Sequence, residues 1–200
     1  VDRSLVEASE KGDLNKVQQL LNSGADPNVE DYANHTALYY AAEKGHFNIA
    51  KLLLDKGAKV NHESGDSALL WACHYGHVDI VKLLIENGAD VNAKRSIDYS
   101  TPLSFAVHRN HKEIVELLLE KGADANVANQ HGETALDRSK PETVAILRKH
   151  GGKTGEDLGA KPWNWKEMET VARELLGTYE WKHGNEQLGL KTGQMILLRD

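Results

Sequence analysis

The sequence has little of what several classes of protein depend on. It holds a single cysteine, Cys73, so no intrachain disulfide can form. This fits a reducing compartment, and we expect the cytoplasm. No apolar run approaches the roughly 20 residues that a membrane span requires, and no signal peptide is visible at the start. The sequence begins with Val1 rather than methionine, which leaves room for a leader that was removed or omitted.

An excess of positive charge is lacking as well. The formal net charge is -6 at pH 7, and 40% of the residues are hydrophobic and 27% are charged, which is the balance of an ordinary globular protein. The phosphates of nucleic acids are bound by cationic surfaces. We therefore expect neither nucleic acid nor a membrane as the partner.

Catalytic motifs are a third absence. The sequence contains no nucleophile elbow, no phosphate-binding glycine loop and no metalloprotease helix. Cys73 lies between Ala72 and His74, where the repeat described next requires a small residue, so a buried and unreactive thiol is favoured over a nucleophile. We expect no enzyme activity, no catalytic residue and no cofactor.

The sequence does contain a repeat. A tetrad of the Gly-Ala-Asp type occurs four times, and its glycines, Gly24, Gly57, Gly88 and Gly122, lie 33, 31 and 34 residues apart. Two further markers repeat with the same set of spacings. They are Thr36, Ser67, Thr101 and Thr134, and Gly12, Gly45, Gly76 and Asn110. The three markers share the same irregular spacings. The insertions and deletions that cause these spacings therefore lie in one connecting loop of the repeat.

Each period predicts a helix, a turn, a second helix and a loop. The threonine and serine markers are expected to cap a short first helix, and Gly45, Gly76 and Asn110 are expected to end it. The second helix carries apolar residues at i, i+3 and i+4, as in Ile80, Leu83 and Leu84.

Two rows of apolar residues run across the periods. One is Val17, Ala50, Val81, Val115 and Val144, and the other is Leu20, Leu53, Leu84, Leu118 and Leu147. A single helix pair cannot bury both of its faces, so the pairs must stack on one another. The predicted fold is an all-α repeat solenoid of about five units, of which the last is about four residues short around 139–142.

The motifs resemble those of a known family. Thr101-Pro102-Leu103, the Gly45-His46 pair and the Gly-Ala-Asp-Val-Asn run at 88–92 are similar to ankyrin repeats, and the resemblance covers residues 1 to about 152. It implies an ankyrin-type helix-turn-helix solenoid that binds other proteins. The sequence departs from the family in one motif, the Thr-Pro-Leu-His stretch. In the family, the histidine of this stretch forms hydrogen bonds between neighbouring repeats. Its position is filled here by Tyr39, Leu70, Ser104 and Asp137.

The resemblance also implies where a partner binds, namely on a concave face made of loop tips and outward positions of the first helices. The expected partner-binding residues are Tyr32, His35, Glu43, Lys44, His74, Tyr75, Ile97, Tyr99, His108, Arg109 and His131. Tyrosine and arginine are enriched at interface hot spots. Tyr40 and Trp71 are assigned to the core instead.

Two recurrent polar residue types have alternative interpretations. His74, His77, His108 and His111 could form a metal cluster, but packing and loop contacts are favoured because no carboxylates or thiolates accompany them, and we expect no metal. Asn28, Asn61, Asn92 and Asn126 are favoured as residues that hold a turn over targets of hydroxylation, which the family also shows.

The remaining residues follow a different pattern. Residues 153–164 are rich in glycine and charge and predict a linker. Residues 165–200 predict an amphipathic helix that begins at Trp165, followed by an incomplete β hairpin at 178–198, and we expect a β domain to continue beyond the sequence given.

The sequence thus predicts a non-enzymatic protein–protein interaction module, monomeric, with a protein or peptide partner. The alternative is a regulatory or targeting arm of a larger protein whose active domain lies beyond residue 200.

Overall fold

The computed structural model describes residues 3–61 and 67–159. The chain divides into two units, Val1–Ala160 and Lys161–Asp200, and the described residues belong to the first. The predicted helix from Trp165 and the β hairpin at 178–198 lie outside them.

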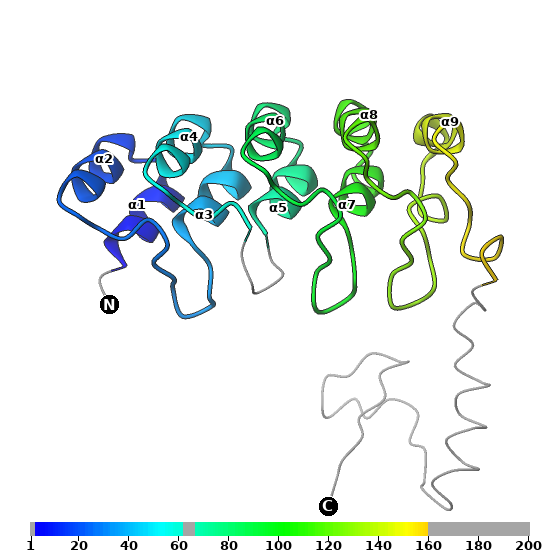
Figure 1. Cartoon of the computed structure of the whole chain (residues 1–200), viewed down its shortest axis with the longest axis horizontal. Coiled ribbons are helices and arrows are strands. Elements are labelled where there is room, and N and C mark those ends of the chain that lie inside the picture. Colours follow the sequence, from blue (N-terminus) through cyan, green and yellow to red (C-terminus); the bar gives the residue numbers. More distant parts are fainter. Residues whose placement is uncertain (1–2, 62–66, 160–200) are drawn as a thin grey trace, which may run out of the picture. The chain divides into compact units, whose positions relative to one another are not determined.

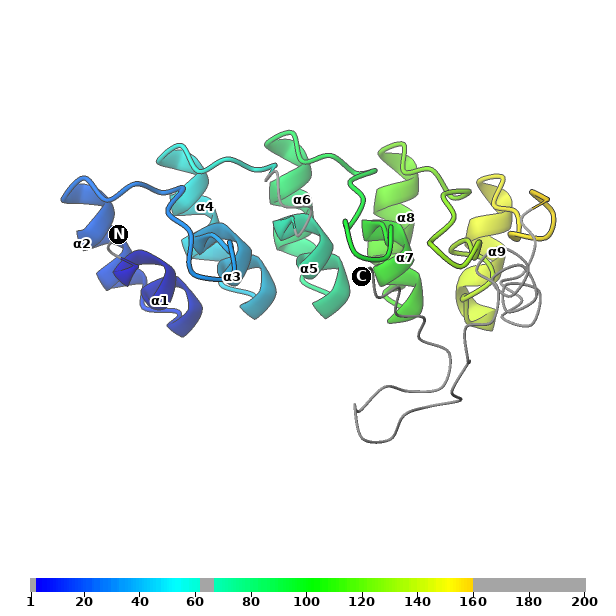
Figure 2. The same ribbon diagram turned by 90° about the horizontal axis from the view of Figure 1, so that it is seen from below.

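The described residues form helix pairs that stack side by side (Figure 1). The helices are α1 (Ser4–Lys11), α2 (Leu14–Asn22), α3 (Ala37–Lys44), α4 (Phe47–Asp55), α5 (Ala68–Tyr75), α6 (Val78–Glu86), α7 (Pro102–His108), α8 (Lys112–Glu120) and α9 (Pro141–Lys149). The first helices α1, α3, α5 and α7 lie in one layer, and the second helices α2, α4, α6, α8 and α9 lie in another (Figure 1). Seen from below, the helix pairs follow one another in a row (Figure 2). Loops that join successive pairs project beyond the first layer (Figure 1). Strand pairing within 3–61 and 67–159 is limited to one isolated bridge between Glu30 and Thr36, which confirms the all-α prediction there.

The first helices begin where the hydroxyl residues predict. The side chains of Thr36 and Ser67 accept the backbone N–H three residues later, and so does Thr101 in front of α7. Ser104 closes a capping box with Thr101, and Pro102 occupies the first helical position, where a missing N–H costs nothing. Ser104 therefore serves its own helix at a position where the family has its bridging histidine.

The fifth unit departs from the prediction, because residues 135–138 form a turn and not a helix. Six residues separate Thr134 from Pro141, which starts α9, whereas ten separate Thr36 from the start of α4. An eight-residue helix and a turn do not fit into that length. Thr134 caps no helix; its backbone N–H donates to Asp137 (2.7 Å) and its hydroxyl to the Lys153 carbonyl (2.6 Å).

The two apolar rows form the core. Leu53, Leu84, Leu118 and Leu147 are fully buried, and so are Val17, Ala50, Val81 and Val115. The two exceptions are Leu20 and Val144, which are half-buried and belong to the terminal units. A terminal unit has one neighbour, so one side of its helices faces water.

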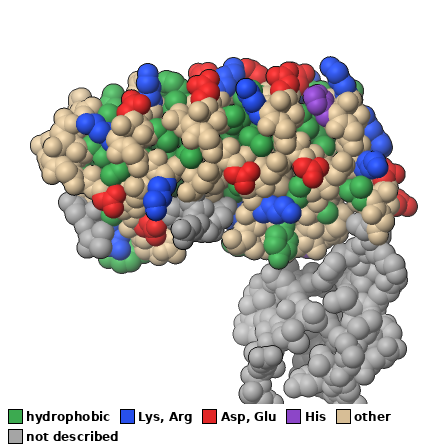
Figure 3. All heavy atoms as spheres, viewed as in Figure 1, with side chains coloured by type: hydrophobic (Ala, Val, Ile, Leu, Met, Phe, Trp, Pro, Cys, Tyr) green, Lys and Arg blue, Asp and Glu red, His purple; other side chains and the backbone are tan. Residues whose placement is uncertain are grey.

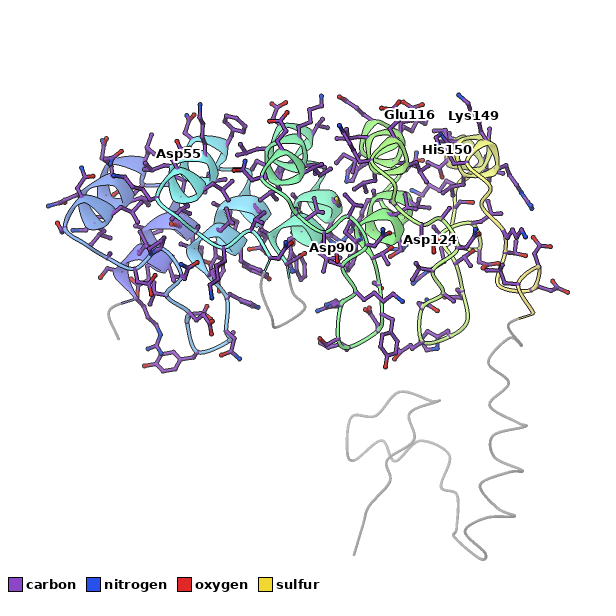
Figure 4. All side chains as sticks on the ribbon, in the orientation of Figure 1. Asp55, Asp90, Glu116, Asp124, Lys149 and His150 are labelled. Atoms are coloured by element: carbon purple, nitrogen blue, oxygen red, sulfur yellow. The ribbon has the colours of Figure 1, made fainter. Side chains whose placement is uncertain are left out.

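Two series of hydrogen bonds join each unit to its neighbour. The rings of His46, His77 and His111 bond through Nε2 to carbonyl oxygens of the preceding first helix, at 3.3, 3.0 and 3.1 Å. At the other end, Asn92 donates to the Gly122 carbonyl and accepts the Asp124 N–H, and Asn28, Asn61 and Asn126 make the same pair of bonds. The asparagine side chains therefore hold the turn of the next unit, whereas the prediction was that each holds the turn of its own loop. Figure 4 shows Asp90 and Asp124 in two successive turns of this series.

None of the helices in the described part of the chain is both long and apolar enough to cross a membrane.

Candidate functional site

We call the surface made by the exposed side of the first helices, together with the loops that precede them, the inner face. It contains the largest exposed apolar side chains of the predicted site: Tyr32 is 90% exposed, Ile97 69%, Tyr99 53% and Tyr75 48%. His108, Arg109 and His131 are exposed as well. Three predicted residues are less accessible, because His35 and His74 are half-buried and the Glu43 side chain is largely covered and paired with Lys44 at 3.2 Å.

An aromatic cluster occupies the middle of the inner face. The Trp71 ring centroid lies 5.7 Å from that of Tyr39, 5.5 Å from His74, and 6.2 Å from both Tyr75 and Phe105. We call these five residues of α3, α5 and α7 the aromatic cluster. Since its rings come from α3, α5 and α7, the cluster is continuous across three units. Tyr39 is its buried member, and the other four rings are half-buried or exposed.

The assignment of Tyr40 and Trp71 to the core is wrong, because both are half-buried, as is Phe105. All three follow the capping hydroxyl by four residues, and Arg138 has the same position in the fifth unit and is exposed. An arginine in a row indicates that the row reaches the surface. Arg138 is therefore the sequence signal that this row is exposed, and it places Trp71 and Phe105 at the site.

The loop that carries Tyr32 is ordered by the half-buried carboxylate of Asp31. Asp31 accepts hydrogen bonds from the backbone N–H groups of Ala33 (2.8 Å) and His35 (2.9 Å) and from the Tyr40 hydroxyl (2.7 Å). Burial alone would raise the pKa of Asp31, but these hydrogen bonds outweigh it and lower the pKa. At the tip, the Arg3 guanidinium lies 3.5 Å from the centre of the Tyr32 ring. The loop therefore presents Tyr32 from a fixed base.

The loop that carries Ile97 and Tyr99 is held in a comparable way. Asp98 accepts the Ser100 N–H (3.0 Å) and lies 3.8 Å from Arg95, while its carbonyl accepts the Gln130 N–H (3.1 Å) of the next loop. Tyr99 has φ 58°, a left-handed conformation that is uncommon for a tyrosine. Such outliers persist where surrounding contacts impose them, and here the contacts fix the position of an exposed ring.

Cationic groups lie beside the aromatic cluster. An Arg109 Nη donates to His74 Nε2 at 2.7 Å, and the Arg95 guanidinium lies 5.5 Å from the centre of the Trp71 ring. Burial, followed by the charges of Arg109, His108 and His111, lowers the pKa of His74. Burial, followed by Arg138 and Arg109, also lowers the pKa of His108. Both imidazoles are therefore neutral near pH 7.

The residues considered for other chemistry have structural roles. His77 and His111 bond to backbone carbonyls, and no group of three histidine, cysteine, aspartate or glutamate side chains in the described ranges converges as a metal site would. Cys73 is fully buried, and burial raises the pKa of its thiol, so it stays protonated and unreactive.

Comparison with known families matches two family models over most of the described part of the chain. One, described as ankyrin repeats (3 copies), matches residues 5–95, and the other, described as ankyrin repeats (many copies), matches residues 95–138. No curated protein gives a significant match to the chain.

Proposed function

The chain belongs to the ankyrin-repeat family, and from this premise we propose that its inner face binds a protein or peptide partner. Ankyrin repeats are in general protein-interaction modules, and only ankyrin repeats are recognised in the chain. The proposed contact residues are Tyr32, His35, Glu43, Lys44, His74, Tyr75, Ile97, Tyr99, His108, Arg109 and His131. The aromatic cluster adds Trp71 and Phe105 to them.

One observation carries the proposal, namely that exposed aromatic rings stand on an ordered base. Tyr75 packs against Trp71, and Tyr32 and Tyr99 sit on loops fixed by Asp31 and Asp98. A tyrosine held in place before binding loses little entropy when a partner covers it, so its apolar area contributes to affinity. On the face that Figure 3 shows, acidic and basic side chains are mixed along the edge made by the second helices.

The proposal is tested by removing rings from the inner face. Tyr75→Ala and Tyr99→Ala should each weaken binding by about 1–2 kcal/mol or more, as truncated aromatic hot spots do. The measurement is calorimetric titration with a partner recovered by pull-down on the full chain, with a thermal melt of each variant to verify that it folds.

Matched controls lie on the second helices. Lys51 of α4 and Glu116 of α8 are exposed, and Figure 4 shows Glu116 at the edge away from the loops. Lys51→Ala and Glu116→Ala should change affinity by no more than a few tenths of a kcal/mol, the usual scale for surface changes outside a site. If these changes abolish binding and the tyrosine changes do not, the partner uses the second helices and the proposal is wrong.

A further inference from the structure

The charged residues at the C-terminal ends of the first helices differ along the array. Two residues before Gly12, Gly45, Gly76 and Asn110 stand Glu10, Glu43, His74 and His108. The residues that follow these are Lys11, Lys44, Tyr75 and Arg109, and the fifth unit adds Arg138 and Lys140. An anionic ligand would therefore meet a carboxylate beside the lysine in α1 and in α3, whereas no carboxylate stands beside Arg109 in the sequence.

Arg109 is the cation best placed to bind an anion. Its side chain is exposed, and the bond from one Nη to His74 holds the guanidinium against the aromatic cluster. A guanidinium has five N–H donors in a planar fork that matches a carboxylate. No carboxylate within 3–61 and 67–159 pairs with Arg109, so most of these donors are available to a partner.

The acidic groups nearby are already engaged. Glu133 pairs with Arg138 at 3.8 Å and accepts from Asn129, and Asp137 accepts the backbone N–H of Thr134 and that of Gly155. Burial is the first cause of the lowered pKa values of His74 and His108. Arg109 contributes to both, Arg95 to that of His74, and Arg138 and Lys140 to that of His108, which indicates that these cations act on one region.

Resting on the proposed function, we propose that the partner presents an acidic peptide segment to the third and fourth repeats. Its carboxylates pair with Arg109 and the neighbouring cations, and an apolar side chain next to them packs on Trp71, Tyr75 and Phe105. Charge complementarity favours this occupant, and the carboxylates of Glu10 and Glu43 make the first two repeats less favourable for it than the region around Arg109. A nucleic acid would need a longer cationic track than this region offers on a chain of net charge -6.

The test selects random dodecapeptides displayed on phage against the full chain, and then titrates the enriched peptides by fluorescence anisotropy. We expect enriched peptides with several Asp or Glu residues beside an aromatic or aliphatic one. Arg109→Glu should weaken their binding at least about tenfold, as loss and reversal of a central charge does. Lys51→Glu makes the same change of charge on a second helix and should alter binding less than about twofold. Arg109→Gln, which keeps N–H donors, should give an intermediate loss, and thermal melts should show all three variants folded.

Three outcomes would overturn the inference. Enriched peptides without acidic residues that lose affinity with Tyr75→Ala, but not with Arg109→Glu, would refute the acidic partner and leave the proposed function standing. Equal competition by a single-stranded oligonucleotide of twelve nucleotides would mean that the region accepts any polyanion, which also refutes an acidic peptide as the occupant. If no enriched peptide responds to either Tyr75→Ala or Arg109→Glu, the inference and the proposed function both fail.

Discussion

At the scale of single residues, His74 connects the repeat architecture to the inner face. Its backbone carbonyl accepts a hydrogen bond from the His111 ring of the next unit, while its own ring accepts one from Arg109 and lies against Trp71 and Phe105. Because Nε2 accepts, the neutral ring carries its proton on Nδ1, which is buried and has no hydrogen-bond partner among the described residues. Protonation of Nε2 would set two cations 2.7 Å apart.

This arrangement predicts that acid destabilises the protein in part through His74. The folded state lowers the pKa of His74 from its ordinary 6.5, so below that value the unfolded chain binds more protons and the free energy of unfolding falls. The contribution is fully present above about pH 6.5 and is lost as the pH drops through the folded value. Urea unfolding at about pH 7 and pH 5.5 should therefore show a smaller loss for His74→Gln, which does not titrate, than for the unaltered protein. Equal losses would mean that His74 titrates as it does in the unfolded chain.

At the scale of helices, the sequence predicts which residues cap each helix, but it does not predict how deeply each side chain is buried. A hydroxyl before a helix, or a glycine after it, acts within one turn of its own position, so the caps at Thr36, Ser67 and Thr101 follow from the sequence alone. The first helix predicted for the fifth unit is wrong, because the shortening by about four residues around 139–142 leaves too little chain between Thr134 and Pro141 for a helix and a turn. Trp71 was misplaced for another reason, since periodicity assigns a residue to a row but does not say how deeply that row is buried.

The ends of the first helices also depend on the next unit, and a pair of glycines tests this. Gly45 has φ 79°, and a Cβ added there would lie 2.7 Å from Cε1 of the His77 ring. Gly57 has φ 88° and no atom within 4 Å of such a Cβ. Gly57→Ala should cost about 1–2 kcal/mol of unfolding free energy, from backbone strain alone.

Gly45→Ala should cost more than Gly57→Ala, because the His77 ring must also move and give up its bond to the Glu43 carbonyl (3.0 Å). Urea denaturation of the two variants gives the comparison. In a His77→Ala background the difference between the two glycine changes should shrink, since the obstructing ring is gone. A difference that persists there would locate the cost elsewhere than in the contact between units.

At the scale of the whole described array, one set of contacts is repeated from unit to unit. The leucine and valine rows, the histidine bonds and the asparagine bonds each join a unit to its neighbours, and none of them joins distant units. Stability in such an array is approximately a sum over units and their interfaces. The charged residues of the inner face can therefore differ from unit to unit while the contacts between units stay the same.

The same reasoning predicts how the cost of a core truncation depends on its position in the array. Leu84 of α6 is fully buried between two neighbouring units, whereas Leu20 of α2 is half-buried at the end. Leu84→Ala should cost about 2–5 kcal/mol, as truncations of buried leucines do, because atoms on both sides lose contacts and a cavity remains. Leu20→Ala should cost clearly less, because part of its side chain already faces water and only one neighbouring unit loses contacts. Equilibrium denaturation in urea measures both, and an unchanged m-value would show that each variant still unfolds over the same surface. Equal costs at the two positions would contradict a linear array in which terminal units have a single neighbour.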